Sequence, residues 1–315
     1  MKKHLLLLCF FVTSLVYSQV KAVKPSFDKK EIAINTLING SLYSPIKKAK
    51  KPNLVILIAG SGPTDRNGNQ AGMTNNSLRY LAEGLAKNGI ATFSYDKRIF
   101  ALMASGTVNE ATLSFNDFIM DAKNVFTHFK NQKKYNKIII AGHSEGSLLG
   151  MVAANNNADA FISIAGAGRS IDAVIVEQIE KQAPFLKDEV IKDFEILKSG
   201  KTFELKNEML ASLFRTSVQP YMISWLKYSP QEEIKKLKIP TLIVNGTKDL
   251  QVSVSEAELL KKALPTAELV IIDSMNHVFK EINGDTTENM KSYSDPELPI
   301  AVPFLNTITR FIKAL

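Results

Sequence analysis

The stretch from Ile138 to Ser147 reads "IIIAGHSEGS", three β-branched residues followed by a serine between two glycines. Its part from Gly142 to Gly146 fits the pattern G-x-S-x-G, with a strand-like run before it and helix-compatible residues after it. In this context the motif predicts a sharp strand-to-helix turn that strains the backbone of Ser144 and lifts its Oγ above the sheet edge. Ser144 is therefore either a nucleophile or only the cap of the next helix, and the context favours the nucleophile.

Similar strand-like runs recur along the chain and alternate with amphipathic, helix-like segments. Apolar runs predict buried strands at residues 53–60, 90–96, 137–142, 160–166, 239–249 and 267–273. Helical periodicity or helix-compatible residues predict helices at 77–88, 115–130, after Ser144, at 254–263 and at 302–314. Alternation of this kind indicates a mostly parallel central sheet flanked by helices, an α/β fold, after an N-terminal hairpin that turns around Asn39-Gly40.

One long segment interrupts this alternation. From Ile171 to about Lys238 the strand pattern disappears and helix formers prevail. An insertion of this length between two strands of one sheet predicts a helical cap over the active face. The predicted organisation is an export signal at 1–18, a first core part at 19–170, the cap at 171–238 and a second core part at 239–315.

The N-terminal residues "MKKHLLLLCFFVTSLVYSQ" combine a basic start, an apolar stretch and small residues near Ser18. This pattern predicts a cleaved export signal, and hence a periplasmic or secreted protein. The alternative, an uncleaved anchor, fits less well because the apolar run is short and no stop-transfer charges follow it. We therefore expect no stable membrane insertion after cleavage. The single cysteine, Cys9, would leave with the signal, which excludes disulfides and thiolate catalysis in the mature chain.

The composition of this 315-residue chain limits the classes of partner that it can bind. Hydrophobic residues make up 45% and charged residues 22%, as in a globular domain. The net charge is +8, but the lysines are scattered or lie in loop-like runs such as "PIKKAKK" (Pro45 to Lys51). Because no aromatic residues interleave with these charges, we expect no nucleic-acid partner. The oligomeric state stays open.

A serine nucleophile needs a general base, and the chain has four histidines. His4 would leave with the signal, and His128 lies off the apolar stripe of its predicted helix, where we expect it to be solvated. His143 neighbours the serine but should be turned away from it. His277 follows the last predicted strand, where open parallel sheets place their chemistry, and is predicted to be the base.

The acid that orients this base is predicted to be Asp249, which follows the preceding strand. Its competitors are Asp172, at the entrance to the cap, and Asp273, at the end of the last strand. The order Ser144, Asp249, His277 is that of α/β-hydrolases. The oxyanion donors should be the backbone N–H of Glu145 and one from the glycine-rich loop "GSGPTDRNGN", at Ser61 or Gly62.

The sequence resembles a group of bacterial α/β-hydrolase serine esterases, known as lysophospholipase-like or serine-aminopeptidase-like hydrolases. The resemblance runs from about Phe27 to the C-terminus and rests on "GSGPTDRNGN", "YDKR", "AGHSEGS", "SVQPYMISWLKYSP", "NGTKDLQV" and "MNHVFK". It implies hydrolysis of small-molecule carboxylic esters by a Ser144, Asp249, His277 acyl-enzyme mechanism, without metal or organic cofactor. The family usually continues its Asp-Lys-Arg with Gly-x-Gly, whereas here residues 99–103 read "IFALM".

Several residues keep alternative interpretations. Charged residues at the ends of neighbouring strands form either a substrate clamp or a buried structural network, and the network is favoured: Asp65, Arg66, Asp96 and Arg98. In the cap, two or three of six residues should face the site, the rest forming the cap's own core: Met209, Leu213, Phe214, Tyr221, Met222 and Trp225.

Two other functions stay open. A peptidase acting on small peptides or amides would use the same triad, and an acidic cap residue facing Ser144, such as Glu177, Glu180 or Glu204, would favour it. A binding protein that kept the fold without catalysis is the third hypothesis, and the complete triad argues against it.

Overall fold

The structure is a computed structural model that describes residues 26–46 and 51–315. The predicted export signal and Cys9 lie outside these residues. Within them, no helix is both long enough and apolar enough to cross a membrane.

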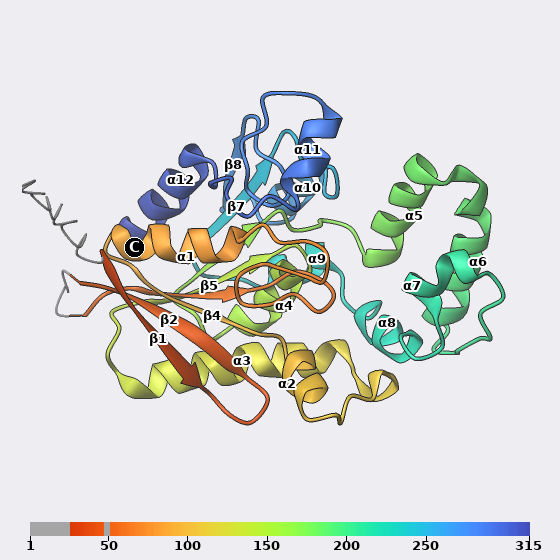
Figure 1. The fold of residues 1–315 in the computed structure, drawn as a ribbon, viewed down its shortest axis with the longest axis horizontal. Helices are drawn as coiled ribbons and strands as arrows, with labels where there is room; N and C mark the ends of the chain where they lie inside the picture. The colour runs from red at the N-terminus through yellow and green to blue at the C-terminus, as the bar shows by residue number, and fades with distance from the viewer. Residues whose placement is uncertain (1–25, 47–50) are drawn as a thin grey trace, which may run out of the picture.

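An eight-stranded sheet forms the centre of the molecule, in the order β1-β2-β4-β3-β5-β6-β7-β8 (Figure 1). Its strands are β1 Phe27–Ala33, β2 Asn39–Pro45, β3 Leu54–Ile58, β4 Ala91–Tyr95, β5 Ile138–His143, β6 Ala160–Ile164, β7 Thr241–Gly246 and β8 Glu268–Ile272. Only the pairs β1–β2 and β2–β4 are antiparallel. The predicted parallel strands are all present, so their carboxyl ends meet at one edge of the sheet.

Helices cover both faces of the sheet (Figure 1). The core helices are α1 Ser77–Lys87, α2 Ile99–Ala104, α3 Phe115–Gln132, α4 Glu145–Ala154, α10 Val254–Ala263, α11 Thr286–Ser292 and α12 Val302–Lys313. All five residues of β3 are buried, although successive side chains point to opposite faces of the sheet. Each face must therefore be covered by its own layer of helices. Ile56 packs in the cluster that contains α3 and α4, whereas Val55 packs in the one that contains α1 and α12.

The N-terminal hairpin turns earlier than predicted. Asn39 and Gly40 lie within β2, where Gly40 pairs with Ile32. The turn is instead closed by Asn35, whose Oδ1 accepts hydrogen bonds from the backbone N–H groups of Leu37 and Ile38 at 2.8 and 2.9 Å. An asparagine side chain that binds nearby backbone N–H groups makes a turn as readily as the Asn-Gly pair does.

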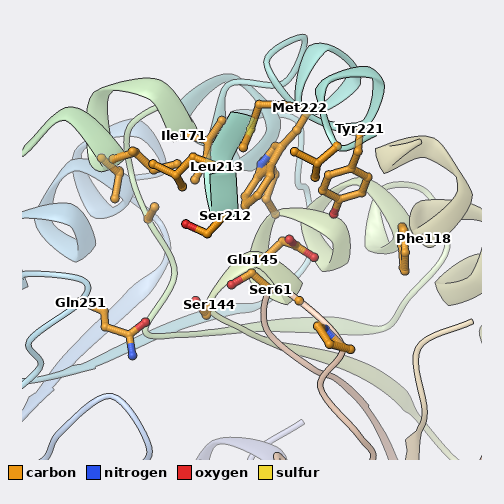
Figure 2. A pocket seen from close by; sticks show the side chains of 18 of the residues that line it. Ser61, Phe118, Ser144, Glu145, Ile171, Ser212, Leu213, Tyr221, Met222 and Gln251 are labelled. Atoms are coloured by element: carbon orange, nitrogen blue, oxygen red, sulfur yellow. The ribbon is translucent and has the colours of Figure 1, made fainter. Parts of the chain in front are cut away.

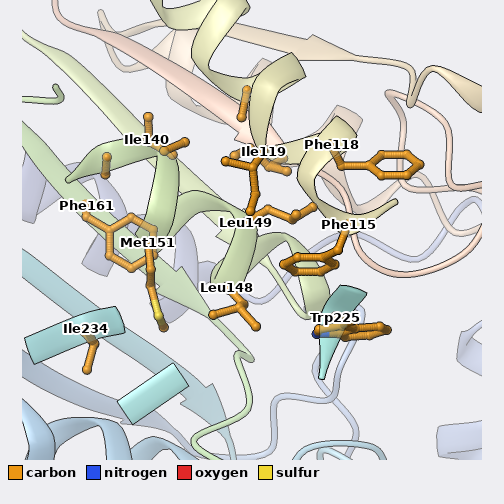
Figure 3. Packing of buried hydrophobic residues seen from close by; sticks show 14 of the residues in the cluster. Phe115, Phe118, Ile119, Ile140, Leu148, Leu149, Met151, Phe161, Trp225 and Ile234 are labelled. Carbon is orange, nitrogen blue, oxygen red and sulfur yellow. The ribbon is translucent and has the colours of Figure 1, made fainter. Parts of the chain in front are cut away.

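The segment between β6 and β7 is helical and extends beyond one end of the sheet (Figure 1). Its α-helices are α5 Ile171–Gln182, α6 Lys187–Lys198, α7 Ala211–Phe214, α8 Gln219–Trp225 and α9 Pro230–Lys235. We refer to residues 171–238 as the cap. Figure 3 shows its Trp225 beside Phe115 of α3, and the two rings stack with centroids 5.3 Å apart. Aromatic packing therefore joins the cap to the core.

Candidate active site

Ser144 lies at the turn between β5 and α4, with φ 54° and ψ −121°. Non-glycine residues rarely adopt a positive φ, and such strain is typical of functional sites. The backbone holds the turn on both sides: Ser144 N–H donates to Ile164 O at 2.9 Å, and Ser147 N–H donates to Ser144 O at 2.9 Å. The Ser144 side chain makes no cap hydrogen bond to α4. Ser144 thus occupies the N-cap position of α4 without capping the helix through its side chain, which leaves its Oγ available for chemistry.

The two glycines of the motif allow this turn to pack against its neighbours. A Cβ added to Gly142 would lie 1.9 Å from Gly146 O. A Cβ on Gly146 would lie 2.4 Å from Ile58 O and 2.6 Å from Ala59 O, at the end of β3. These neighbours are backbone atoms, which cannot swing away as a flexible side chain would.

Replacing Gly146 with alanine should lower the free energy of unfolding by about 3 kcal/mol, because the added methyl group collides with the backbone of β3. We expect the melting temperature, followed by circular dichroism, to fall by roughly 6 °C. Gly72→Ala is the matched control, since Gly72 has a φ of 76° but no atom within 4 Å of an added Cβ. The free energy of unfolding of Gly72→Ala should fall by only about 1 kcal/mol, the cost of placing alanine at a positive φ. Equal losses in the two variants would contradict the collision.

Asp249 and His277 meet as predicted from their places after β7 and β8. His277 Nδ1 lies 2.8 Å from Asp249 Oδ2, and both side chains are almost fully buried. Asp249 Oδ1 accepts the backbone N–H groups of Gln251 and Val252, each at 2.8 Å. These bonds fix the carboxylate, which in turn can hold the imidazole with Nδ1 protonated and Nε2 free to act as a base.

The two competing acids lie elsewhere. Asp273 is exposed and accepts a hydrogen bond from Thr247 Oγ1 at 3.0 Å. Asp172, at the first turn of α5, forms an ion pair with Lys198. Burial raises the pKa of Asp172, but its hydrogen bond with Lys198 and other local contacts bring it below the ordinary value. Asp172 is therefore a structural ion-pair partner in the cap.

His143 contacts His277 through both its ring and a hydrogen bond. Its Nε2–H donates to His277 O at 3.0 Å, and the two rings lie with centroids 4.7 Å apart. Burial, helped by the charge that His277 can carry, holds the pKa of His143 well below its ordinary value. His143 thus stays neutral at pH 7 and, as the residue before Ser144, connects the Ser144 turn to the His277 loop. His128 is half-buried against Phe129 instead of solvated, at 5.1 Å between ring centroids.

In the described part of the chain, the hydrogen bonds do not include one between Ser144 Oγ and His277 Nε2. Such catalytic hydrogen bonds often tighten only when substrate binds. Ser144 and His277 lie in loops at the carboxyl ends of β5 and β8, and the contact between His143 and His277 holds these loops together.

A pocket of about 560 Å³ opens between the cap and the core, with Ser144 on its floor (Figure 2). Ser61, Gly62 and Glu145, the residues predicted to supply the oxyanion donors, line the same floor. Gly60 packs so closely that a Cβ on it would lie 3.2 Å from Ser144 Cβ. The glycine-rich loop therefore runs directly beside the serine.

The cap side of the pocket is mostly apolar, with Gln178, Ser212 and Arg215 as its polar residues (Figure 2). Of the six candidates in the cap, four line the pocket, more than predicted: Leu213, Tyr221, Met222 and Trp225. Phe214 is instead buried against Phe194 and Phe203 in the cap's own core. Met209 is exposed.

The charged residues after β3 and β4 make structural contacts, as we expected, but of the four only Arg66 and Asp96 pair with each other. Arg66 lies 2.5 Å from Asp96 Oδ2, and Arg98 Nε lies 2.7 Å from Asp121 Oδ2. Asp65 accepts the backbone N–H groups of Asn67 and Asn69 in its own loop. None of Asp65, Arg66, Asp96 and Arg98 lines the pocket, so they do not form a substrate clamp.

Lys97 is the residue of the site that sequence reasoning missed. It lines the pocket, and its Nζ lies 2.6 Å from Glu145 Oε1 and 2.8 Å from Gly60 O. A lysine directly after a buried strand, in "SYDKR", was the available signal.

Comparisons with known proteins agree with this architecture. The BD-FAE family model matches residues 41–264. Esterase EstD of Thermotoga maritima is 28% identical over 268 residues, which cover 83% of this chain and 62% of that protein. The chain therefore spans less than two thirds of the length of this curated relative.

Two solved structures show the same fold. Est1E from Butyrivibrio proteoclasticus superimposes with a TM-score of 0.58 and 18% identity, over 91% of this chain and 99% of that one. The Pyrococcus horikoshii acylaminoacyl peptidase gives 0.55 and 17%, over 92% of this chain and 42% of that one. With the sheet order described above, they confirm the predicted α/β-hydrolase fold.

Proposed function

Because the chain belongs to the BD-FAE family, we propose that it hydrolyses carboxylic esters through Ser144, His277 and Asp249. The observation that carries this proposal is the strained Ser144 turn on the floor of a pocket, linked through His143 to a buried pair of Asp249 and His277. The esterase relative with 28% identity supports it. The export signal predicted at residues 1–18 adds the proposal that the protein acts in the periplasm or outside the cell.

In the proposed mechanism, Ser144 Oγ attacks the ester carbonyl while His277 Nε2 takes its proton. The tetrahedral oxyanion accepts hydrogen bonds from the N–H of Glu145 and that of Ser61 or Gly62. His277 then returns the proton to the leaving alcohol, and an acyl group stays on Ser144. A water molecule, activated by the same imidazole, releases the acid. Asp249 holds the imidazole throughout.

The electrostatics of the pocket favour esters over substrates with a free amino group. Glu110 and Glu145 are the acidic residues that line it, and they are paired with Arg215 and Lys97. The three cap glutamates weighed above do not line it, and two of them are paired within the cap or its entrance: Glu177 with Arg169 and Lys181, and Glu180 with Lys187. An amine therefore meets no unpaired carboxylate among the described pocket residues.

The pocket lining also indicates an apolar group on the substrate. Besides the four cap residues, the apolar side chains of the lining come from both sides: Ile99, Leu113, Phe118, Leu148, Ile171, Val174, Ile175, Val218 and Val252. Burying an apolar acyl or alcohol chain here is favourable by about 25 cal/mol per Å².

A panel of p-nitrophenyl esters of increasing acyl length, assayed beside aminoacyl p-nitroanilides, tests this proposal. We expect kcat/KM for the best ester to exceed that for any amide by at least about 100-fold, a difference that corresponds to roughly 3 kcal/mol in barrier. Labelling of the wild type, but not of Ser144→Ala, by a fluorophosphonate would dismiss a non-catalytic binding protein. Preference for the amides would favour the peptidase.

A further inference from the structure

A buried ion pair forms part of the pocket floor. The Lys97 and Glu145 side chains are 5% and 1% exposed, and their charged atoms are 2.6 Å apart. Lys97 follows β4, Glu145 begins α4, and the third partner of this group, Gly60, follows β3. The Lys97 ammonium also lies 4.9 Å from the centre of the Phe118 ring. One cation thus joins three segments that meet at the same edge of the sheet.

Stability alone does not explain this pair. Removing two charges from water is costly, and a buried ion pair is often no more stabilising than apolar residues of the same volume. The proposed ester hydrolysis uses the backbone N–H of Glu145 and leaves its carboxylate without a role. A negative carboxylate beside a developing oxyanion is unfavourable unless it is neutralised.

The contact with Gly60 has a direct geometric consequence. The carbonyl of Gly60 and the N–H of Ser61 belong to the same planar peptide unit, in which they point in opposite directions. By holding Gly60 O at 2.8 Å, Lys97 fixes the direction in which the Ser61 N–H points. A hydrogen bond to the carbonyl also polarises the peptide, which strengthens that N–H as a donor.

The contact with the Glu145 side chain holds in place the residue whose backbone N–H is the second proposed oxyanion donor. The Glu145 carboxylate is fixed by Lys97 on one side, and the Tyr221 hydroxyl from the cap points towards it (Figure 2). Burial and the nearby carboxylate raise the pKa of Tyr221 well above its ordinary value, so the phenol stays protonated. Lys97 therefore binds the carbonyl of the peptide unit that carries the Ser61 N–H, and also the side chain of Glu145, whose own N–H is the second donor.

We propose that Lys97 is a positioning residue that holds the oxyanion hole together by binding Gly60 O and Glu145 at once, with Ser61 as the loop donor. The inference rests on the proposed ester hydrolysis, because an oxyanion hole matters only to such a reaction. It assigns Lys97 and the Glu145 carboxylate to transition-state stabilisation and leaves substrate binding to the pocket walls.

The test uses the full chain and three variants. Lys97→Met removes the link but leaves the Glu145 carboxylate buried and unpaired, which can impair folding. The double variant Lys97→Met/Glu145→Gln removes both charges and should fold, so it keeps the test valid. Arg98→Met is the control matched to Lys97→Met, because it breaks the neighbouring pairs with Asp117 and Asp121 outside the pocket and likewise leaves a buried carboxylate, that of Asp121, without its arginine.

In hydrolysis of the best p-nitrophenyl ester, the double variant should lose about 10- to 100-fold in kcat, with KM changed less than about threefold. Inhibition by phenylboronic acid, whose tetrahedral serine adduct places an oxygen in the oxyanion hole, should weaken at least about tenfold. Lys97→Met should lose as much or more. Arg98→Met should keep kcat within about twofold.

A folded double variant with the kcat of the wild type would overturn the positioning role, as would a loss confined to KM. A loss of kcat in Arg98→Met equal to that of the double variant would also overturn it, since any broken pair would then suffice. These outcomes leave the ester hydrolysis of the wild type intact. A wild type without Ser144-dependent ester turnover would overturn the proposed function and this inference together.

Discussion

Ser144→Ala should lower kcat for p-nitrophenyl ester hydrolysis by about 10⁴-fold or more, because no other group can form the acyl-enzyme at this turn. KM should change little, since the apolar walls that contact the substrate are untouched. The measurement is steady-state kinetics on purified protein, with circular dichroism to show that the variant is folded.

Ser147→Ala is the matched control for this variant. Ser147 lies one helical turn further along α4, is buried, and shares a hydrogen bond of 2.7 Å with Ser163 Oγ outside the pocket. It should keep kcat within about threefold. If Ser144→Ala retained more than a few per cent of wild-type kcat, the nucleophile would have to be another residue.

Asp249→Asn should lower kcat by about 10³- to 10⁴-fold. An asparagine can present its amide N–H₂ to His277 Nδ1, which favours the tautomer whose Nε2 is protonated and cannot accept the Ser144 proton. The loss should shrink as the pH is raised towards alkaline values, where serine ionises more readily without a base. Kinetics from pH 6 to pH 10 measure both effects.

Asp172→Asn serves as the comparison, because Asp172 was the strongest competitor for the acid. Its partner Lys198 lies in the cap, so the variant should keep wild-type kcat while losing a small part of its stability. A large loss of kcat in this variant, with Asp249→Asn active, would reverse the assignment of the acid.

Much of the fold could be predicted from the sequence because parallel strands buried on both faces read as continuous apolar runs. β3, β5 and β6 are of this kind, and their predicted positions agree with the structure to within a few residues. The turn of the hairpin lies earlier than the sequence predicts, because Asn35 closes it with its side chain. The pair Asn39-Gly40 carries the more familiar turn signal but lies within β2. Local propensity alone does not decide between two adjacent turn signals.

The candidate site could be predicted at positions where few residues of the required type follow the end of a predicted strand. His277 and Asp249 follow consecutive strands of the sheet, so their meeting follows from topology. Lys97 was not predictable in this way, since a lysine at a strand end is usually solvated. Lys97 is buried because Glu145, after β5, and Gly60, after β3, both contact its ammonium group. These residues are distant in the sequence, so no local pattern predicts the contact.

The cap lies in the sequence between two groups of proposed site residues, so the ribosome synthesises one group before the cap and the other after it. Ser61, Lys97, Ser144 and Glu145 are made before the cap, whereas Asp249 and His277 are made after it. A growing chain that has reached the cap thus carries a nucleophile and its oxyanion donors but no base. In the proposed mechanism, hydrolysis can begin only when β7 and β8 have been synthesised and added to the sheet, so unfinished chains should not hydrolyse esters.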